Sequence, residues 1–228
     1  MAKKKELTLD TLLDAILPHV VFDGWSPASF KAALGDLNIS EAEAKLVAPR
    51  GAIDLAVAYH RRADAAMVAR LSEADLDDLR YSEKVATALR YRIEAMDNRE
   101  AVRRASTLFA LPMNTVEGGK LVWETADAIW NALGDTSDDA NWYTKRATLS
   151  GVWASTVLFW LGDDSAGFAD TFAFIDRRID DVMRIEKMKS KLRENPLSKP
   201  LMQFQDAFFS KMRAPGDAPD DLPGSVSR

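Results

Sequence analysis

The chain has 228 residues, of which 47% are hydrophobic and 29% are charged, as in globular proteins that bury a sizeable core. Its formal net charge of −5 argues against a surface built to neutralise nucleic-acid phosphates. It contains no cysteine, which excludes disulfides, thiolate nucleophiles and thiolate metal sites.

The N-terminal sequence MAKKKELTLD has lysines followed by acidic residues and no apolar run, so neither a secretory signal nor a transit peptide is predicted. The longest strongly apolar run, residues 151–161, is about half the length that spans a bilayer. No transmembrane segment is expected, and any contact with a membrane would be peripheral.

Hydrophobic residues recur with the period of an α-helix along almost the whole chain, and no strand is predicted. A first helix is expected at residues 8–20, ended by the turn Asp23-Gly24-Trp25. We therefore predict an all-α protein.

Two further short helices are expected before residue 50. Ser26 followed by proline predicts the start of a helix at residues 26–34, which Gly35 would close. Ser40 and Glu43 have the spacing of a capping box that opens the third helix. Three short helices joined by tight turns are typical of a helix-turn-helix unit.

Longer helices are expected at residues 52–71, 75–96, 99–111, 116–133, 138–161 and 166–194. This order predicts a TetR-repressor-like plan, in which a small N-terminal unit precedes a larger ligand-holding bundle. The predicted parts are a helix-turn-helix-like unit at 1–51, a helical bundle at 52–194, an amphipathic helix at 195–213 and a disordered tail at 214–228.

The charge of the N-terminal unit does not favour DNA binding. Residues 1–60 have six lysines and arginines against eight aspartates and glutamates, a net charge of −2. The would-be recognition helix, SEAEAKLV, begins with two glutamates where phosphate contacts should lie. We expect no nucleic-acid partner, although a regulator with an apolar effector remains the main alternative.

No enzyme motif is present. The only histidines are His19 and His60, both interpreted as helix-end or surface residues. The acidic run at residues 135–139 lacks the pattern of a calcium loop and is explained by helix capping. Gly118-Gly119 indicates close helix packing rather than a phosphate loop. We predict no catalytic residue, metal site or cofactor.

One polar helix turn carries residues that dominate protein interfaces. Asp139, Trp142, Tyr143 and Arg146 fall on one helix face, and Trp, Tyr and Arg are the commonest interface hot spots. They form either an exposed partner-binding patch or a packed arrangement in which Trp142 lies under a loop and Asp139 pairs with Arg146.

The long helices are rich in large apolar side chains, and the sequence leaves open whether they fill the core or surround a lipid pocket. The candidate lipid contacts are Leu89, Ile93, Leu108, Phe109, Leu121, Ile129, Trp153, Phe159, Trp160 and Phe172.

The last amphipathic stretch would either dock on its own domain or lie on a membrane. The candidate membrane contacts are Leu197, Leu201, Phe204, Phe208, Phe209 and Met212.

Three stretches together resemble one family: FDGWSPASFKAAL (22–34), SDDANWYTKRATLSGVWASTVLFWL (137–161) and FIDRRIDDVM (174–183). The chain resembles a bacterial form of the Coq-nine accessory proteins of ubiquinone biosynthesis. The resemblance implies a TetR-like fold without DNA binding, an apolar pocket for an isoprenoid or quinone lipid, and a C-terminal helix that touches the membrane. It also implies a Coq-seven-like di-iron hydroxylase, or an equivalent, as the partner of Asp139, Trp142, Tyr143 and Arg146.

The resulting hypothesis is a non-catalytic lipid carrier that presents quinone precursors to a hydroxylase. We expect a cytoplasmic homodimer, peripherally associated with the inner membrane. The carrier interpretation requires apolar space between the helices at 138–161 and 166–194. If the bundle is solid, a ligand-free interaction scaffold is the remaining alternative.

Overall fold

The computed structural model describes residues 7–194, and all the regular secondary structure in this part of the chain is helical, as predicted. The helices are α1 (Leu9–Asp23), α2 (Pro27–Leu37), α3 (Glu41–Lys45), α4 (Ala52–Glu73), α5 (Tyr81–Glu94), α6 (Arg99–Ala110), α7 (Thr115–Ala132), α8 (Ala140–Leu161), a short 3₁₀ turn η1 (Ala166–Phe168) and α9 (Ala169–Glu194).

The helix starts follow the capping signals of the sequence. Thr8 caps α1, and its hydroxyl accepts a hydrogen bond from the Thr11 amide at 3.1 Å. Ser26 caps α2 directly before proline. The predicted capping box is confirmed, because Glu43 accepts from the Ser40 amide while Ser40 accepts from the Glu43 amide. These bonds satisfy amides that a helix leaves unpaired in its first turn.

Two predicted helix boundaries are wrong, the end of α2 and the start of α5. Gly35 does not close α2, which continues to Leu37 and ends at Asn38 in the left-handed conformation, with φ of 51°. The fifth helix begins at Tyr81 and not at residue 75. Asp75 instead accepts a hydrogen bond from the backbone of Asp77, and such local bonds from aspartate compete with a helix.

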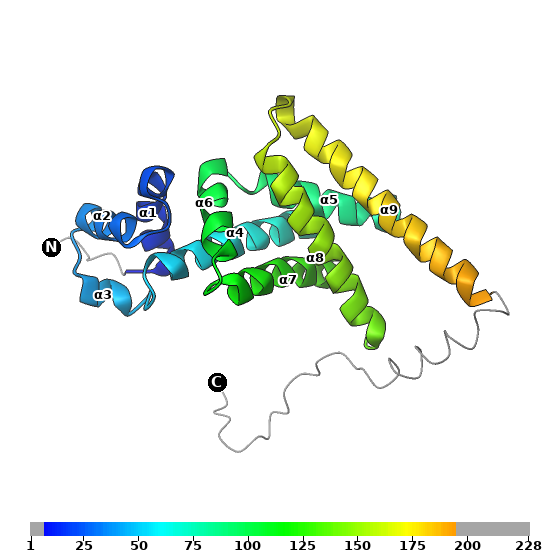
Figure 1. Ribbon diagram of the computed structural model, residues 1–228, viewed down its shortest axis with the longest axis horizontal. Coiled ribbons are helices and arrows are strands. Elements are labelled where there is room, and N and C mark those ends of the chain that lie inside the picture. The colour runs from blue at the N-terminus through cyan, green and yellow to red at the C-terminus, as the bar shows by residue number, and fades with distance from the viewer. Residues whose placement is uncertain (1–6, 195–228) are drawn as a thin grey trace, which may run out of the picture.

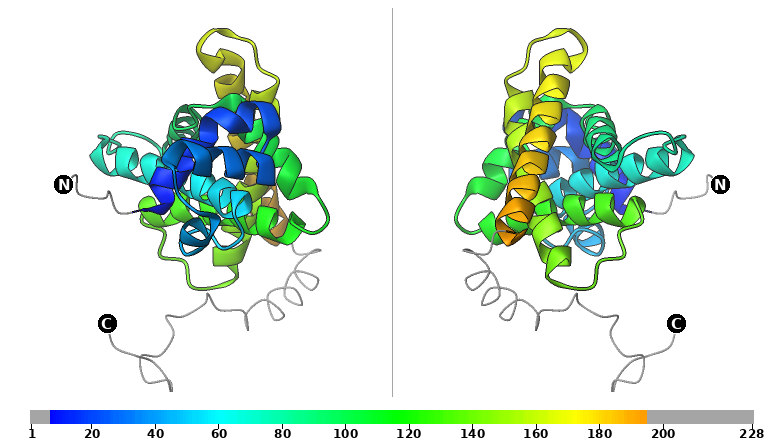
Figure 2. Two further views of the ribbon diagram at one scale, coloured as in Figure 1. Left: turned by 90° about the vertical axis from the view of Figure 1, so that its left-hand side faces the viewer. Right: turned by 90° about the vertical axis from the view of Figure 1, so that its right-hand side faces the viewer.

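The helices form a small unit and a larger bundle joined by α4. In Figure 1, α1–α3 lie at one end of the molecule and α4 leads from them into the layer of α5 to α8. The two views of Figure 2 place α9 on the outside at the opposite end. Helix α4 packs against α1, α5 and α7, while α8 packs between α7 and α9.

Trp25 connects the two parts. It follows Gly24, whose φ of 67° lets the chain turn sharply after α1. Its indole Nε1 donates to the Ala101 carbonyl of α6 at 3.0 Å, and its ring lies 5.7 Å from that of Tyr59 in α4. One hydrophobic core therefore continues from α1 into the bundle. The domain boundary at residue 51 stays a prediction.

The predicted amphipathic helix, with Leu197, Leu201, Phe204, Phe208, Phe209 and Met212, and the predicted tail from residue 214 lie outside the described residues. Within residues 7–194, no helix is both long enough and apolar enough to cross a bilayer.

Candidate functional site

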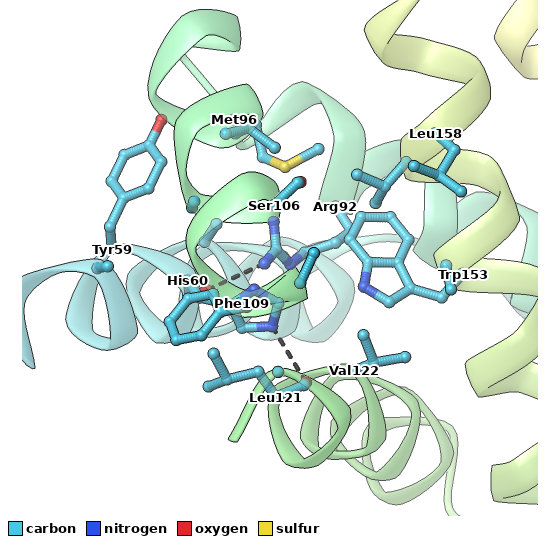
Figure 3. A pocket seen from close by; sticks show the side chains of 18 residues that line it. Tyr59, His60, Arg92, Met96, Ser106, Phe109, Leu121, Val122, Trp153 and Leu158 are labelled. Atoms are coloured by element: carbon cyan, nitrogen blue, oxygen red, sulfur yellow. Dashed lines mark hydrogen bonds between the residues drawn. The ribbon is translucent and has the colours of Figure 1, made fainter. Parts of the chain in front are cut away.

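The larger bundle contains a mainly apolar cavity of about 280 Å³ between α4, α6, α7 and α8, with α5 contributing one side chain. Figure 3 shows the side chains that converge on it. Ala110 and Leu158 line the cavity and are exposed, so the mouth lies between the end of α6 and α8. The labelled lining residues are Tyr59, His60, Arg92, Met96, Ser106, Phe109, Leu121, Val122, Trp153 and Leu158.

Gly118 lets α6 and α7 approach closely on one side of this cavity. A Cβ atom at position 118 would lie 2.8 Å from Cβ of Phe109, which is closer than real side chains approach. At Gly119 a Cβ would meet nothing within 4 Å. Close helix packing is therefore confirmed for the first glycine of the pair and not for the second.

A buried polar cluster adjoins the cavity, and two of its residues, His60 and Arg92, line it. The Arg92 guanidinium, 1% exposed, donates from Nε to Asp64 at 2.6 Å and from Nη2 to the His60 carbonyl at 3.0 Å. Thr125 also donates to Asp64, at 2.9 Å. Each buried charge is thus paired and hydrogen-bonded, as burial in a helix bundle demands.

His60 belongs to the same cluster. Its Nε2 lies 2.8 Å from the Thr125 hydroxyl and 3.1 Å from the Leu121 carbonyl. Burial, assisted by the charge of Arg92, lowers the pKa of His60 to about 4, so the imidazole is neutral near pH 7. The interpretation of His60 as a helix-end or surface residue is wrong, because it lies within α4 and points inward.

Three of the ten predicted lipid contacts line this cavity, namely Phe109, Leu121 and Trp153. The other predicted contacts lie elsewhere. Leu89, Ile93, Ile129 and Trp160 are buried in the core, Leu108 and Phe172 pack against that core, and Phe159 stacks on Phe174 with ring centroids 4.5 Å apart.

A second, slightly smaller cavity of about 260 Å³ lies between α5, α8 and α9, with Trp130 of α7 contributing one side chain. It is the space that the carrier hypothesis required between the last two long helices. Its walls include Tyr81, Trp130, Leu149 and Ile179, and none of the ten predicted lipid contacts lines it. The three predicted contacts that line a cavity all belong to the first one, among α4, α6, α7 and α8.

The four residues of the predicted partner patch do not form one exposed face. The Asp139 side chain caps α8 by accepting from the Asn141 amide at 2.8 Å. Arg146 is 1% exposed, so its assignment as a direct partner contact is wrong. The alternative pairing with Asp139 is also wrong, because Arg146 pairs with Asp127 and Asp135.

Trp142 and Tyr143 are the half-buried members of that patch. The Arg146 guanidinium carbon lies 4.0 Å from the centre of the Trp142 ring. Trp123 of α7 is tilted against the same ring at 5.9 Å, and Tyr143 meets it edge-on at 4.8 Å. A cation and two aromatic rings thus hold Trp142 in one orientation.

Burial would raise the pKa of Asp135, but hydrogen bonds from Lys145, Ser137 and Arg146 outweigh it and leave the pKa of this carboxyl below its ordinary value of 3.8. The acidic run at 135–139 therefore supplies a buried anchor for Arg146 as well as a cap. Among the described residues, no group of three or more histidines and carboxylates could hold a metal ion.

The N-terminal unit offers a short recognition helix. Helix α3 spans only Glu41–Lys45, and its first turn has Glu41 and Glu43. Lys45, its basic residue, pairs with Glu41 at 2.7 Å. The expectation that the chain has no nucleic-acid partner stays a prediction.

The sequence interpretation missed Asp64, Arg92 and Thr125. The signal was present, because Arg92 lies between Leu89 and Ile93 on an apolar helix stripe and Asp64 lies one turn after His60. A charged residue within an apolar stripe indicates a buried, paired group.

Comparison with known proteins shows which proteins the chain is similar to. Residues 115–186, which span α7, α8 and most of α9, match the COQ9 family model. The ubiquinone biosynthesis protein COQ9-A of Xenopus laevis is 32% identical over 189 residues, 79% of this chain and 59% of that protein. The COQ9 of Rattus norvegicus is 31% identical over 76% of this chain and 58% of its own length. The chain spans about three-fifths of the length of these relatives.

The fold has a solved counterpart. The crystal structure of a TetR transcriptional regulator from Nitrosomonas europaea superposes with a TM-score of 0.63, covering 75% of this chain and 95% of the regulator. The two are 20% identical. This confirms the predicted TetR-like all-α fold.

Proposed function

This chain carries the COQ9 family domain at residues 115–186, and from that premise we propose that it is a non-catalytic lipid-binding protein of ubiquinone biosynthesis. It takes an isoprenoid quinone precursor from the membrane surface and presents it to a hydroxylase of the pathway, a Coq-seven-like di-iron enzyme or an equivalent. The observation that supports this proposal most strongly is the apolar cavity between α4, α6, α7 and α8.

The volume of this cavity suits part of such a lipid. Ligand pockets commonly measure about 300–1,000 Å³, and a cavity of about 150 Å³ holds benzene. A cavity of about 280 Å³ has room for one substituted ring, or for the first part of an isoprenoid tail. The rest of a long tail would leave by the mouth beside Leu158, which is 69% exposed.

The surface around this mouth supports a membrane-proximal role. Two exposed apolar side chains follow the end of α6: Met113, in the turn before α7, is 81% exposed, and Val116, in the first turn of α7, is 87% exposed. Transfer of a polyprenyl chain through water is costly because each buried CH₂ contributes about 0.8 kcal/mol. An apolar rim that touches the bilayer lowers this barrier.

The partner surface in this proposal centres on Trp142 and Tyr143 at the start of α8. Both are aromatic residues of the type that dominates interfaces, and Trp142 is held in place by Arg146 and Trp123. Asp139 and Arg146 support this surface from α8 rather than contact the hydroxylase. A homodimer and membrane attachment through residues 195–213 belong to the same proposal.

The test is lipid content after mild purification. Organic extraction and mass spectrometry of the full chain should recover an isoprenoid lipid. Ala105 lines the cavity, so Ala105→Phe should fill it and abolish the bound lipid. Ala66 is exposed on α4, and Ala66→Phe should retain it. Lipid-free wild-type protein that also fails to bind liposomes would refute the proposal.

A further inference from the structure

One nitrogen of a buried arginine faces the cavity without a partner. Arg92 uses Nε and Nη2 for Asp64 and the His60 carbonyl, but its buried Nη1 has no hydrogen-bond partner among the described residues. Figure 3 shows this nitrogen directed toward Ser106 and Met96, two residues that line the cavity. A buried donor without an acceptor costs free energy comparable to a lost hydrogen bond.

The guanidinium cannot turn away to satisfy that nitrogen elsewhere. The Asp64 carboxylate holds it on one edge at 2.6 Å, and the His60 carbonyl holds it on another at 3.0 Å. The Trp153 ring centre lies 5.0 Å from the guanidinium carbon. Nη1 is therefore fixed as a hydrogen-bond donor within a mainly apolar space.

We propose that Arg92 Nη1 donates a hydrogen bond to a neutral oxygen of the bound lipid, such as a ring carbonyl, hydroxyl or methoxy oxygen. The oxygenated ring then lies inside the cavity, and the isoprenoid tail leaves by the mouth beside Leu158. This inference rests on the proposed function and adds the residue that recognises the lipid's ring.

The charges around Arg92 favour a neutral oxygen over an anion. Asp64 balances the charge of Arg92, and Thr125 donates to the same carboxylate. His60 faces the cluster as a neutral imidazole near pH 7, and Tyr59 donates its hydroxyl proton to Asp97. A fatty-acid carboxylate would bring an uncompensated negative charge into this apolar space, which is strongly unfavourable.

The lining favours a ring over a flexible chain at this depth. Trp153 and Phe109 present flat aromatic side chains to the space beside Arg92, and aromatic rings pack well against such surfaces. The cavity is also too small for a long polyprenyl tail, whereas its volume suits one substituted ring.

Calorimetric titration of the full chain with two probes tests the proposal. The first probe is a dimethoxy-methyl-benzoquinone carrying one prenyl unit, and the second is prenylbenzene, which lacks oxygen. Arg92→Lys retains a cation beside Asp64 but removes Nη1. The matched control is Arg99→Lys, because Arg99 also has a buried nitrogen without a described partner but does not line the cavity.

Arg92→Lys should weaken quinone binding by about 10-fold or more, the usual effect of losing a charge-assisted hydrogen bond. The dissociation constant of Arg92→Lys for prenylbenzene should stay within about 3-fold of the wild-type value. Arg99→Lys should bind both probes within about 3-fold of wild type. Equal loss of both probes in Arg92→Lys, with circular dichroism unchanged, would overturn the proposal.

Infrared spectroscopy of the wild-type complex provides a test that does not depend on a variant's folding. The carbonyl band of the bound quinone should shift to lower frequency than in a hydrocarbon solvent. An unshifted band would overturn the role of Arg92 while leaving lipid binding intact. If neither probe binds the wild-type chain, the proposed function itself fails.

Discussion

The guanidinium Nη1 of Arg146 lies 3.1 Å from Oδ2 of Asp135, and both side chains are almost fully buried, with 1% and 3% of their surface exposed. This ion pair joins the α7–α8 connection to the second turn of α8. It also places the Arg146 guanidinium against the Trp142 ring. The orientation of the proposed partner surface thus depends on a buried electrostatic contact beneath it.

Replacing Asp135 should destabilise the fold in a pH-dependent way. Asp135→Asn removes a buried charge, while Asp127 still pairs with Arg146, so the free energy of unfolding at pH 7 should fall by about 1–3 kcal/mol. The folded-state pKa of Asp135 is lowered, so its contribution is complete above the ordinary pKa and disappears as the pH falls through the folded value.

The measurement is urea unfolding of both proteins at pH 7, 4 and 3. The stability difference between wild type and Asp135→Asn should narrow below about pH 4. Asp138 is exposed in the same connection, and Asp138→Asn should stay within about 0.5 kcal/mol of wild type at pH 7. A stability difference that stays constant at all three pH values would contradict the role of this ion pair.

Trp142→Ala should weaken binding of the hydroxylase without unfolding the chain. Trp142 is half-buried against Arg146 and Trp123, and truncating a central interface aromatic commonly costs at least about 2 kcal/mol, or roughly 30-fold in affinity. Biolayer interferometry against the purified hydroxylase measures this loss. Phe22 is 80% exposed on α1 of the N-terminal unit, and Phe22→Ala is the control that should bind normally.

Arg146→Met should reproduce part of this effect indirectly, because it removes the cation that orients Trp142 while leaving the ring in place. The expected result is weaker hydroxylase binding together with a change in near-ultraviolet circular dichroism. Wild-type hydroxylase binding, or an unchanged aromatic signal, would contradict this positioning role of Arg146.

The adjacent glycines of α7 should respond in opposite directions. Gly118→Ala forces a Cβ to within 2.8 Å of Cβ of Phe109, and such overpacking typically costs about 1–3 kcal/mol. Gly119→Ala meets nothing within 4 Å and should stabilise the helix by roughly 0.5–1 kcal/mol. Thermal unfolding of both variants measures these effects. A change in stability of the same sign in both variants would be inconsistent with this packing.

The order and type of the helices followed from local signals. Capping residues such as Ser26 and Ser40 act within a few residues of themselves, so the sequence revealed the helix starts they govern. The predicted end of α2 was wrong because Gly35 is tolerated inside a packed helix. The observed end depends on Asn38, which adopts a left-handed conformation.

The candidate site was less accessible from sequence because it combines residues from five helices. Periodicity identified Phe109, Leu121 and Trp153 as apolar but did not separate them from core residues such as Leu89 and Ile129. That distinction depends on whether tertiary packing leaves space beside a side chain, which no helix sets alone. The burial of Arg146 likewise depends on Asp127 and Asp135, which precede α8 in the chain.

The most direct test of the account is a crystal structure of the full chain purified with its bound lipid. The account predicts electron density for an oxygenated ring between α4, α6, α7 and α8, in contact with Trp153 and within hydrogen-bond distance of Arg92 Nη1. A cavity filled by protein side chains, or lipid density confined to the space between α5, α8 and α9, would contradict it.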